Sequence, residues 1–380
     1  MEPILKEEQG ERRGSLIPLI LALLFPLLLL FLALPEQTAR LSTLRDSGAR
    51  LSSAVGSIKE KELDGLTVVR KIYRLSPGTM APVPDPEGYG LATDGKEIMA
   101  LLDRAAPLLN GRESIFRADT PFLPETGIRY YCDQSILALV WHQRTTDSNG
   151  VSTVVTFSEV FLSDASQFRR KLSDDVFGAG AHKFPTDMAL SVNAVLAASG
   201  DFYRFRAPGF CVFEGKLCKL NTERKIDTCA VDRNGDLLFI PGGTIATEEE
   251  ANAFISEHGV DFTLSFGPIM IEAHAPVRNS YYALGEANLP YPRCCIAQDG
   301  SLHYLVAVTK DSMTVADFTD YMMQTGVERC YALDGGQTGT IVMEGSALNP
   351  SIYGFGNSAQ RAQSDIIYFA SAIPKSERGN

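Results

Sequence analysis

The 380-residue sequence has few of the patterns that metal centres, nucleotide sites and nucleic-acid interfaces require. Its five histidines are scattered, and neither an HExxH pattern nor a CxxC pair occurs, so no metal ligation is expected. It has no GxxxxGK or GxGxxG loop and no internal repeat. A net charge of −11, without a Lys/Arg cluster, argues against nucleic acid as a partner. We therefore expect no metal and no cofactor.

The seven cysteines are odd in number and irregular in spacing, which excludes a regular disulfide framework. Cys211 and Cys218 flank a predicted hairpin turn at Glu214-Gly215, which would place them on directly opposed residues. A bridge between them is geometrically allowed. Buried free thiols remain the favoured interpretation.

One long hydrophobic run stands near the start of the chain. Residues 16–34 carry no charge, and at about 1.5 Å per residue they are long enough to cross the hydrocarbon core of a bilayer. Lys6, Arg12 and Arg13 precede the run and favour a cytoplasmic N-terminus over residues 1–15. We favour an uncleaved signal anchor, with a cleaved signal peptide and a buried core helix as alternatives.

The rest of the chain is predicted to lie outside the membrane. Apolar residues recur at helical spacing over 35–62, which indicates a helical stalk, and a Pro/Gly-rich linker and extension follow over 63–125. A short amphipathic helix is expected at 95–109, before the main domain. Residues 126–374 alternate short strands with helices expected at 186–198, from Thr247 to Gly259 and from Thr314 to Gly326. Hairpin turns at Asn234-Gly235 and Asp299-Gly300 imply antiparallel neighbours. The expected class is α+β, a mixed and largely antiparallel sheet core with flanking helices.

Three segments place a charged residue beside small residues or at the start of a strand. Asp201 follows Gly200, which we expect to supply an unusual φ in a tight bend, or else only to end a helix. Arg293 precedes a buried strand and is suited either to hold a phosphate or to form a surface salt bridge. Asp334 precedes a Gly-Gly pair that is either a hairpin turn or a loop whose amides approach an anion. Further candidate anion contacts are Gly335, Gly336, Thr338 and Arg361.

Taken in order, these segments resemble the phosphodiester glycosidase family. The resemblance covers about residues 185–373 and rests on six motifs: Gly200-Asp201-Phe202-Tyr203, Ser265-Phe266-Gly267-Pro268, Pro292-Arg293, Leu302-His303-Tyr304-Leu305, Leu333-Asp334-Gly335-Gly336, and Arg361 with Ser364-Asp365. The residues after Arg293 and after Gly336 depart from the family's usual pattern.

The resemblance implies hydrolysis of a sugar-1-phosphodiester with release of free sugar. Asp201 and Asp334 would then be the catalytic carboxylates and His303 a supporting hydrogen-bonding group. A strand histidine with a structural role is the simpler alternative for His303. Arg293 and Arg361 would stabilise the phosphate leaving group.

Two other functions are compatible with the same residues. The first is a non-catalytic protein that binds or assembles an envelope glycopolymer on the same fold. The second is a metal-dependent phosphodiesterase, which the scattered histidines disfavour. The expected partners are a sugar-1-phosphodiester glycan or lipid-linked sugar and, through one helix, a bacterial plasma membrane with the C-terminal domain facing outward.

Overall fold

The computed structural model describes residues 58–63, 66–178, 182–201, 209–278, 289–352 and 354–377. Residues from Ile58 onward form one compact unit. The predicted cytoplasmic segment, the predicted membrane anchor and most of the predicted stalk lie outside the described residues. Within the described part of the chain, no helix is long and apolar enough to span a bilayer.

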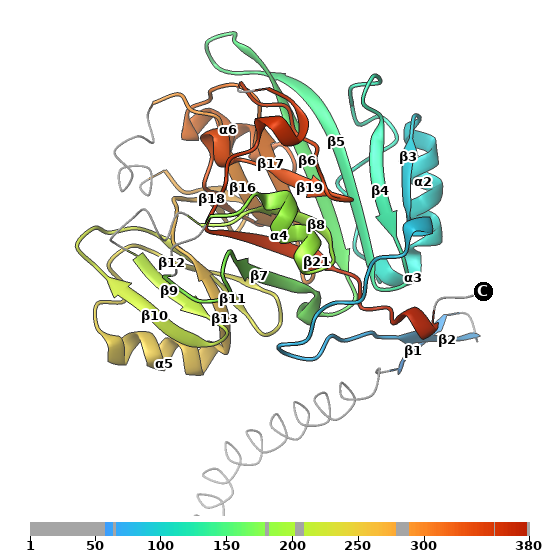
Figure 1. Cartoon of the computed structure of the whole chain (residues 1–380). Helices are drawn as coiled ribbons and strands as arrows, with labels where there is room; N and C mark the ends of the chain where they lie inside the picture. The colour runs from blue at the N-terminus through green and yellow to red at the C-terminus, as the bar shows by residue number, and fades with distance from the viewer. Residues whose placement is uncertain are drawn as a thin grey trace, which may run out of the picture. The chain divides into compact units, whose positions relative to one another are not determined.

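The largest element is a nine-stranded sheet, in which every neighbouring pair with a defined register is antiparallel (Figure 1). Across the sheet its strands are β15 (Ala275–Pro276), β14 (Ile269–Glu272), β18 (Arg329–Leu333), β16 (Cys294–Gln298), β17 (His303–Thr309), β6 (Ser152–Leu162), β5 (Ile136–Thr146), β4 (Ile128–Cys132) and β3 (Tyr89–Ala92). β5 begins with seven consecutive buried residues, because both faces of the sheet are covered there.

A five-stranded antiparallel sheet packs against one face of the larger sheet. Its order is β20 (Ser346–Ala347), β19 (Ile341–Met343), β8 (Ala194–Ser199), β21 (Asp365–Ala370) and β7 (Phe168–Leu172). Side chains of both sheets, among them Leu196, Ile367 and Ile296, share one buried cluster. The chain crosses from the larger sheet to the smaller between β18 and β19.

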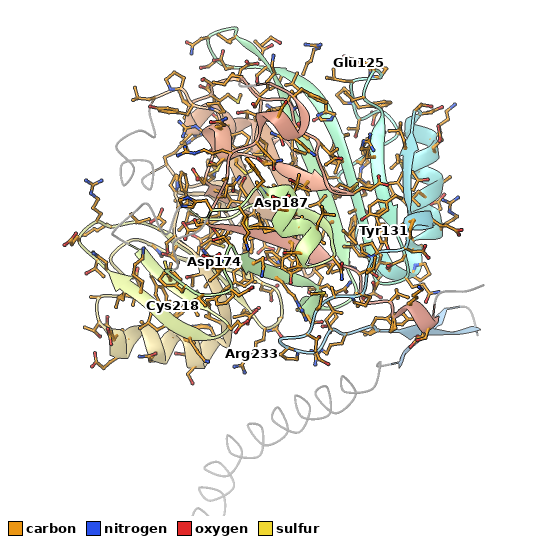
Figure 2. All side chains as sticks on the ribbon, in the orientation of Figure 1. Glu125, Tyr131, Asp174, Asp187, Cys218 and Arg233 are labelled. Carbon is orange, nitrogen blue, oxygen red and sulfur yellow. The ribbon has the colours of Figure 1, made fainter. Side chains whose placement is uncertain are left out.

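The other strands of the described residues form three small sheets. They contain β12 (Leu237–Ile240), β11 (Thr228–Asp232) and β13 (Val260–Leu264); β10 (Lys216–Asn221) and β9 (Gly209–Phe213); and β1 (Ile58–Leu63) with β2 (Leu66–Lys71). The Glu214-Gly215 hairpin forms as predicted, with both residues at positive φ. A bulge at Cys218, labelled on β10 in Figure 2, pairs Lys219 rather than Cys218 with Cys211. The expected direct opposition is therefore wrong, and both thiols are free.

Five helices flank these sheets in the described residues: α2 (Gly95–Arg104), α3 (Ala106–Leu109), α4 (Pro185–Ser191), α5 (Glu248–His258) and α6 (Val315–Met323). α5 begins with the predicted capping box between Thr247 and Glu250 and ends at Gly259, which has a φ of +62°. α6 begins after Thr314 as predicted, and the side chain of Thr314 accepts from the amide of Asp317. α2, α3 and α6 cover the face of the large sheet opposite the five-stranded sheet.

The helix expected over 186–198 is wrong in its second half. It stops at Ser191, Asn193 takes a left-handed conformation, and residues 194–199 form β8. The alanine-rich run has high helix propensity, but it lies buried between α4 and the large sheet, and its backbone pairs with β19 and β21. Tertiary burial overrides local preference in this segment.

Residues 58–125 belong to the same compact unit as residues 126–377. The last part of the predicted stalk, 58–62, is strand β1 rather than helix. Within the segment expected as a linker and extension, β3 extends the nine-stranded sheet, and α2 and α3 bury Ile98, Leu101 and Leu108 against it. We find an α+β fold with large antiparallel sheets and few helices.

Candidate active site at the junction of two sheets

The predicted site segments meet where the chain passes between the two large sheets. β8 ends at Ser199, directly before Gly200 and Asp201, while β18 ends directly before Asp334. The Ser199 hydroxyl donates to the carbonyl of Thr338 and accepts from the amide of Thr340 at 2.8 Å. These bonds fix the segment that carries Asp201 beside the turn that follows Asp334.

Asp201 is held in a buried cluster of charged and polar groups. Its amide donates to both carboxylate oxygens of Asp365, each at 3.1 Å. Its Oδ2 accepts from the amide of Ser265 at 2.8 Å and lies 3.8 Å from Nη2 of Arg170. Its Oδ1 is buried and has no hydrogen-bond partner among the described residues. An acceptor of this kind is available to a ligand or to water.

Arg170, on β7, connects Asp365 and Asp201 through its guanidinium group. Its Nε donates to Oδ2 of Asp365 at 2.7 Å, and its Nη1 donates to the carbonyl of Thr263. The side chains of Arg170, Asp365 and Asp201 are all at most 1% exposed. A buried pair of this type depends on both partners, because loss of one leaves a charge without compensation.

The electrostatics of the cluster follow from its burial. Burial, together with the charge of Asp201, raises the pKa of Asp365 to about 6, against the opposing effect of Arg170. Burial lowers the pKa of Arg170, but the two carboxylates outweigh it, so the net shift is upward. Arg170 therefore stays charged, and its Nη2 lies 3.8 Å from Oδ2 of Asp201.

Gly200 is required by close packing and not by its φ angle. It has no positive φ, so the expectation of an unusual backbone conformation is wrong. A Cβ at this position would lie 2.2 Å from Oδ2 of Asp365. Glycine lets the carboxylate approach the backbone closely enough to accept from the amide of Asp201.

The turn after Asp334 packs on the segment that carries Arg293. The amide of Gly336 donates to the carbonyl of Pro292 at 2.8 Å, and a Cβ at Gly335 would lie 2.4 Å from the same oxygen. The hydroxyl of Thr338 donates to the carbonyl of Gly335. The Gly336 amide and the Thr338 hydroxyl thus stabilise the turn itself, which is a short 3-10 segment and not the hairpin considered from the sequence.

The two predicted arginines differ in their surroundings. Arg293 is half-buried, with its Nε donating to the carbonyl of Met313 at 2.8 Å, its Nη2 to that of Leu289, and its guanidinium 5.7 Å from the ring of Tyr291. Arg361 is exposed and forms no hydrogen bond or ion pair with the other predicted site residues that the structure describes. Its neighbour Gln363 donates to the carbonyl of Thr338 at 2.6 Å, which brings this loop next to the turn.

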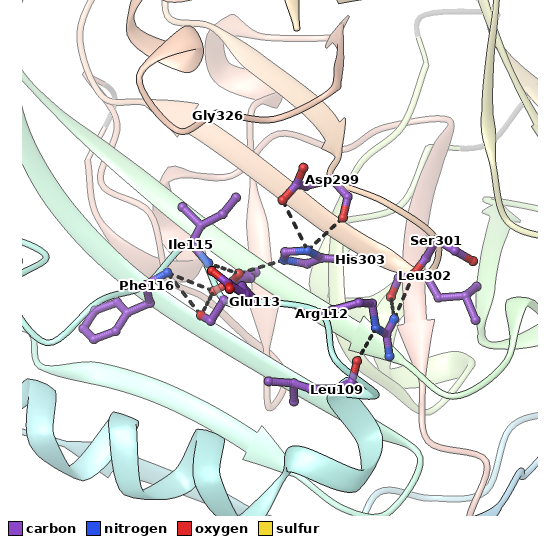
Figure 3. Close-up of polar contacts among 12 residues, drawn as sticks. Leu109, Arg112, Glu113, Ile115, Phe116, Asp299, Ser301, Leu302, His303 and Gly326 are labelled. Atoms are coloured by element: carbon purple, nitrogen blue, oxygen red, sulfur yellow. Dashed lines mark hydrogen bonds and ion pairs between the residues drawn. The ribbon is translucent and has the colours of Figure 1, made fainter. Parts of the chain in front are cut away.

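His303 lies on the other face of the nine-stranded sheet. Figure 3 shows its ring between Asp299 and the segment that contains Ile115 and Phe116. Its Nε2 lies 2.7 Å from Oε1 of fully buried Glu159, and its ring stacks on Phe161. Along β17 the next residue, Tyr304, faces the five-stranded sheet, so His303 points away from Asp201. The structure does not bring His303 together with the aspartates.

Two members of the cluster were missed from the sequence. Asp365 was recognised as part of a motif but given no role, and Arg170 was not noticed. The signal was the alternation of β7, in which Phe168, Arg170 and Leu172 share the buried face. An arginine at an inward strand position requires an acidic partner, which could have directed attention to Asp365. The described residues contain no group of three or more metal-ligating side chains.

The chain is similar to proteins of known structure. The zebrafish N-acetylglucosamine-1-phosphodiester alpha-N-acetylglucosaminidase catalytic domain, auto-inhibited by its pro-peptide, is similar at a TM-score of 0.52 and 15% identity. The similarity covers 62% of this chain and 84% of that one, and it shows a shared fold. A hypothetical protein from Synechocystis aligns at a TM-score of 0.44 and 13% identity, over 66% of this chain and 64% of that one. No curated protein matches the sequence.

The family comparison covers the segments that form the cluster. The sequence profile described as phosphodiester glycosidase matches residues 192–370, which include Asp201, Ser265, Asp334 and Asp365. Arg170 lies outside the matched residues. By this match, residues 192–370, just under half of the chain, are assigned to the phosphodiester glycosidase family.

Proposed function

We propose that this protein hydrolyses the C1–O–P linkage of a sugar-1-phosphodiester and releases free sugar. The observation that carries the proposal is the buried Asp201 carboxylate, whose Oδ2 is fixed by Ser265 while Oδ1 has no partner among the described residues. Family membership implies a hydrolase, and a fixed carboxylate is what a glycosidase needs at the anomeric carbon.

The leaving group explains why cationic residues accompany the carboxylates. A phosphate monoester anion is weakly basic, so its departure needs stabilisation of negative charge more than a proton. Arg293 borders the Asp334 turn, and Arg361 is exposed on the loop whose Gln363 contacts the same turn. We assign the leaving phosphate to this side of the site.

In the reaction, a new bond forms at C1 as the bond from C1 to the phosphate oxygen breaks. The electron pair of the broken bond leaves with the phosphate. In one route Asp201 or Asp334 takes a proton from the attacking water; in the other, one carboxylate attacks C1 and water then cleaves the glycosyl ester. Arg170, buried against Asp365, places its positive charge close to the Asp201 carboxylate in either route.

We also propose that the domain acts outside a bacterial plasma membrane, held there by residues 16–34. This rests on the uncharged run of 19 residues and the preceding basic residues. Its substrate would then be an envelope glycopolymer or a lipid-linked sugar. Labelling the full-length protein in intact cells with a membrane-impermeant reagent tests this location; labelling only after the cells are broken would contradict it.

The activity is tested with purified full-length protein and a panel of sugar-1-phosphodiesters in water labelled with heavy oxygen. Cleavage between C1 and oxygen places the label in the free sugar and yields an unlabelled phosphate monoester. Cleavage between phosphorus and oxygen yields a sugar phosphate and would contradict the proposal. Binding of every substrate without release of sugar would instead support a glycopolymer-binding function.

A further inference from the structure

A cavity lies on the face of the nine-stranded sheet opposite Asp201. Its volume is about 360 Å³, and it is lined by residues of β5 and β6, the loop around Thr120 and the end of α6. Trp141 and Phe157, which form its aromatic wall, belong to the hydrophobic cluster on the α6 side of the sheet. The cavity is therefore separate from the candidate active site.

The aromatic part of the wall is ordered by ring contacts. Phe157 stacks on Trp141 with ring centroids 5.3 Å apart, and Tyr321 lies against Phe157 at 5.8 Å. The hydroxyl of Tyr321 donates to Oε1 of Gln143 at 3.1 Å. This bond leaves the amide NH₂ of Gln143 without a partner among the described residues.

The indole of Trp141 adds a second donor. Its Nε1 is buried and has no hydrogen-bond partner in the described part of the chain. A buried tryptophan N–H usually finds an acceptor, so its lack of one at a cavity wall is informative. A carbonyl or hydroxyl oxygen of a ligand would supply the missing acceptor.

The polar groups that line the cavity disfavour a charged ligand. Its lining contains threonine hydroxyls and glutamine amides but no carboxylate, so it does not suit a cation. Its one charged residue, Arg144, is exposed and lies 3.8 Å from Glu125, which is labelled in Figure 2, so the charge is largely offset. Neutral hydrogen-bonding groups next to aromatic rings suit a ligand with both hydroxyl groups and an apolar face.

We propose that this cavity binds one neutral sugar unit of a glycan, as a site separate from the catalytic one. The volume is in the range of small-ligand pockets, roughly 300–1,000 Å³, and holds a single ring with its substituents. An acetamido carbonyl would accept from Gln143 or Trp141, and the C–H face of the sugar would lie on Tyr321. The proposal rests on the cavity alone and does not depend on hydrolysis.

The chain contains one tryptophan, so its fluorescence reports directly on this cavity. We expect titration of the full-length protein with N-acetylglucosamine to change that fluorescence with saturation, in the wild type and in Asp201→Asn alike. Gln143→Ala should raise the Kd at least about tenfold, whereas Thr146→Ala, an exposed change on the same strand, should leave it unchanged.

Three results would overturn the proposal. The first is that the tryptophan fluorescence shows no saturable change with N-acetylglucosamine, and the second is that Asp201→Asn abolishes this change. The third is that Gln143→Ala and the wild type bind N-acetylglucosamine with the same Kd. Gln143→Ala is expected to unfold at the same temperature as Thr146→Ala within about 2 °C, since Gln143 lies at a cavity edge. If it does not, Gln143→Glu, which keeps the acceptor oxygen and removes the donors, must show the same loss of affinity.

Discussion

The Nε of Arg170 donates a hydrogen bond to Oδ2 of Asp365 over 2.7 Å, and both side chains are excluded from solvent. Replacement of Arg170 by methionine leaves Asp365 and Asp201 buried without their cation. We expect the free energy of unfolding to fall by about 3–5 kcal/mol. Urea denaturation measures this, with the exposed Arg233→Met as the control, for which a change within about 0.5 kcal/mol is expected. Equal stability of the two variants would contradict the structural role of Arg170.

Gly200 is predicted to be intolerant of a methyl group. In Gly200→Ala the new Cβ would lie 2.2 Å from Oδ2 of Asp365, so the carboxylate must move. We expect a loss of stability of about 1–3 kcal/mol together with reduced hydrolysis. The control is Gly95→Ala in the first turn of α2, where the nearest atom would be 3.1 Å away. If Gly200→Ala is as stable and active as the control, the close approach is not needed.

Protonation of Asp365 should make stability depend on pH. Burial raises the pKa of Asp365 to about 6, above the ordinary value of 3.8, so the folded state binds this proton more tightly than the unfolded chain. The contribution to stability is therefore present below pH of about 4 and is lost as pH rises through about 6. Asp365→Asn lacks this titration.

The measurement is the difference in unfolding free energy between wild type and Asp365→Asn across this interval. We expect the wild type to lose stability relative to the variant as pH rises from about 4 to about 7. A constant difference, or a change of the opposite sign, would show that Asp365 does not titrate in this way.

His303 is predicted to stabilise the fold without taking part in hydrolysis. His303→Gln removes the contact between its Nε2 and buried Glu159, which also accepts from the hydroxyl of Ser114 and the amide of Ile115. We expect a loss of about 1–3 kcal/mol of stability, since one acceptor site loses its donor. At a temperature where the variant is folded, kcat/KM should stay within about twofold of wild type; a drop of a hundredfold would place His303 in the reaction.

The fold class, the helix starts and the turns could be predicted from the sequence. The pairing of strands that are distant along the chain could not. The Thr247 capping box, the α6 start at Thr314 and the Glu214-Gly215 turn depend on residues close in sequence, and all three are confirmed. The strand at 194–199 was mistaken for helix because its pairing partners, β19 and β21, lie far along the chain. Local periodicity contains no information about such partners.

In the candidate site, too, the residues with a local sequence pattern were predicted and those defined by distant partners were not. Asp201 and Asp334 were predicted because each is next to glycine, and the segments that carry them are in contact. Arg170 was missed because its importance comes from Asp365, 195 residues away. His303 lay in a recognised motif, but the alternation of β17 points it to the opposite face of the sheet.

The most direct test of the account is the rate of sugar release by Asp201→Asn. The amide keeps the shape and the contact with Ser265 but removes the negative charge at C1. We predict a fall in kcat of at least about a thousandfold, with binding of the sugar-1-phosphodiester and the unfolding temperature close to wild type. Wild-type kcat in Asp201→Asn would contradict the central claim that this buried carboxylate carries the reaction.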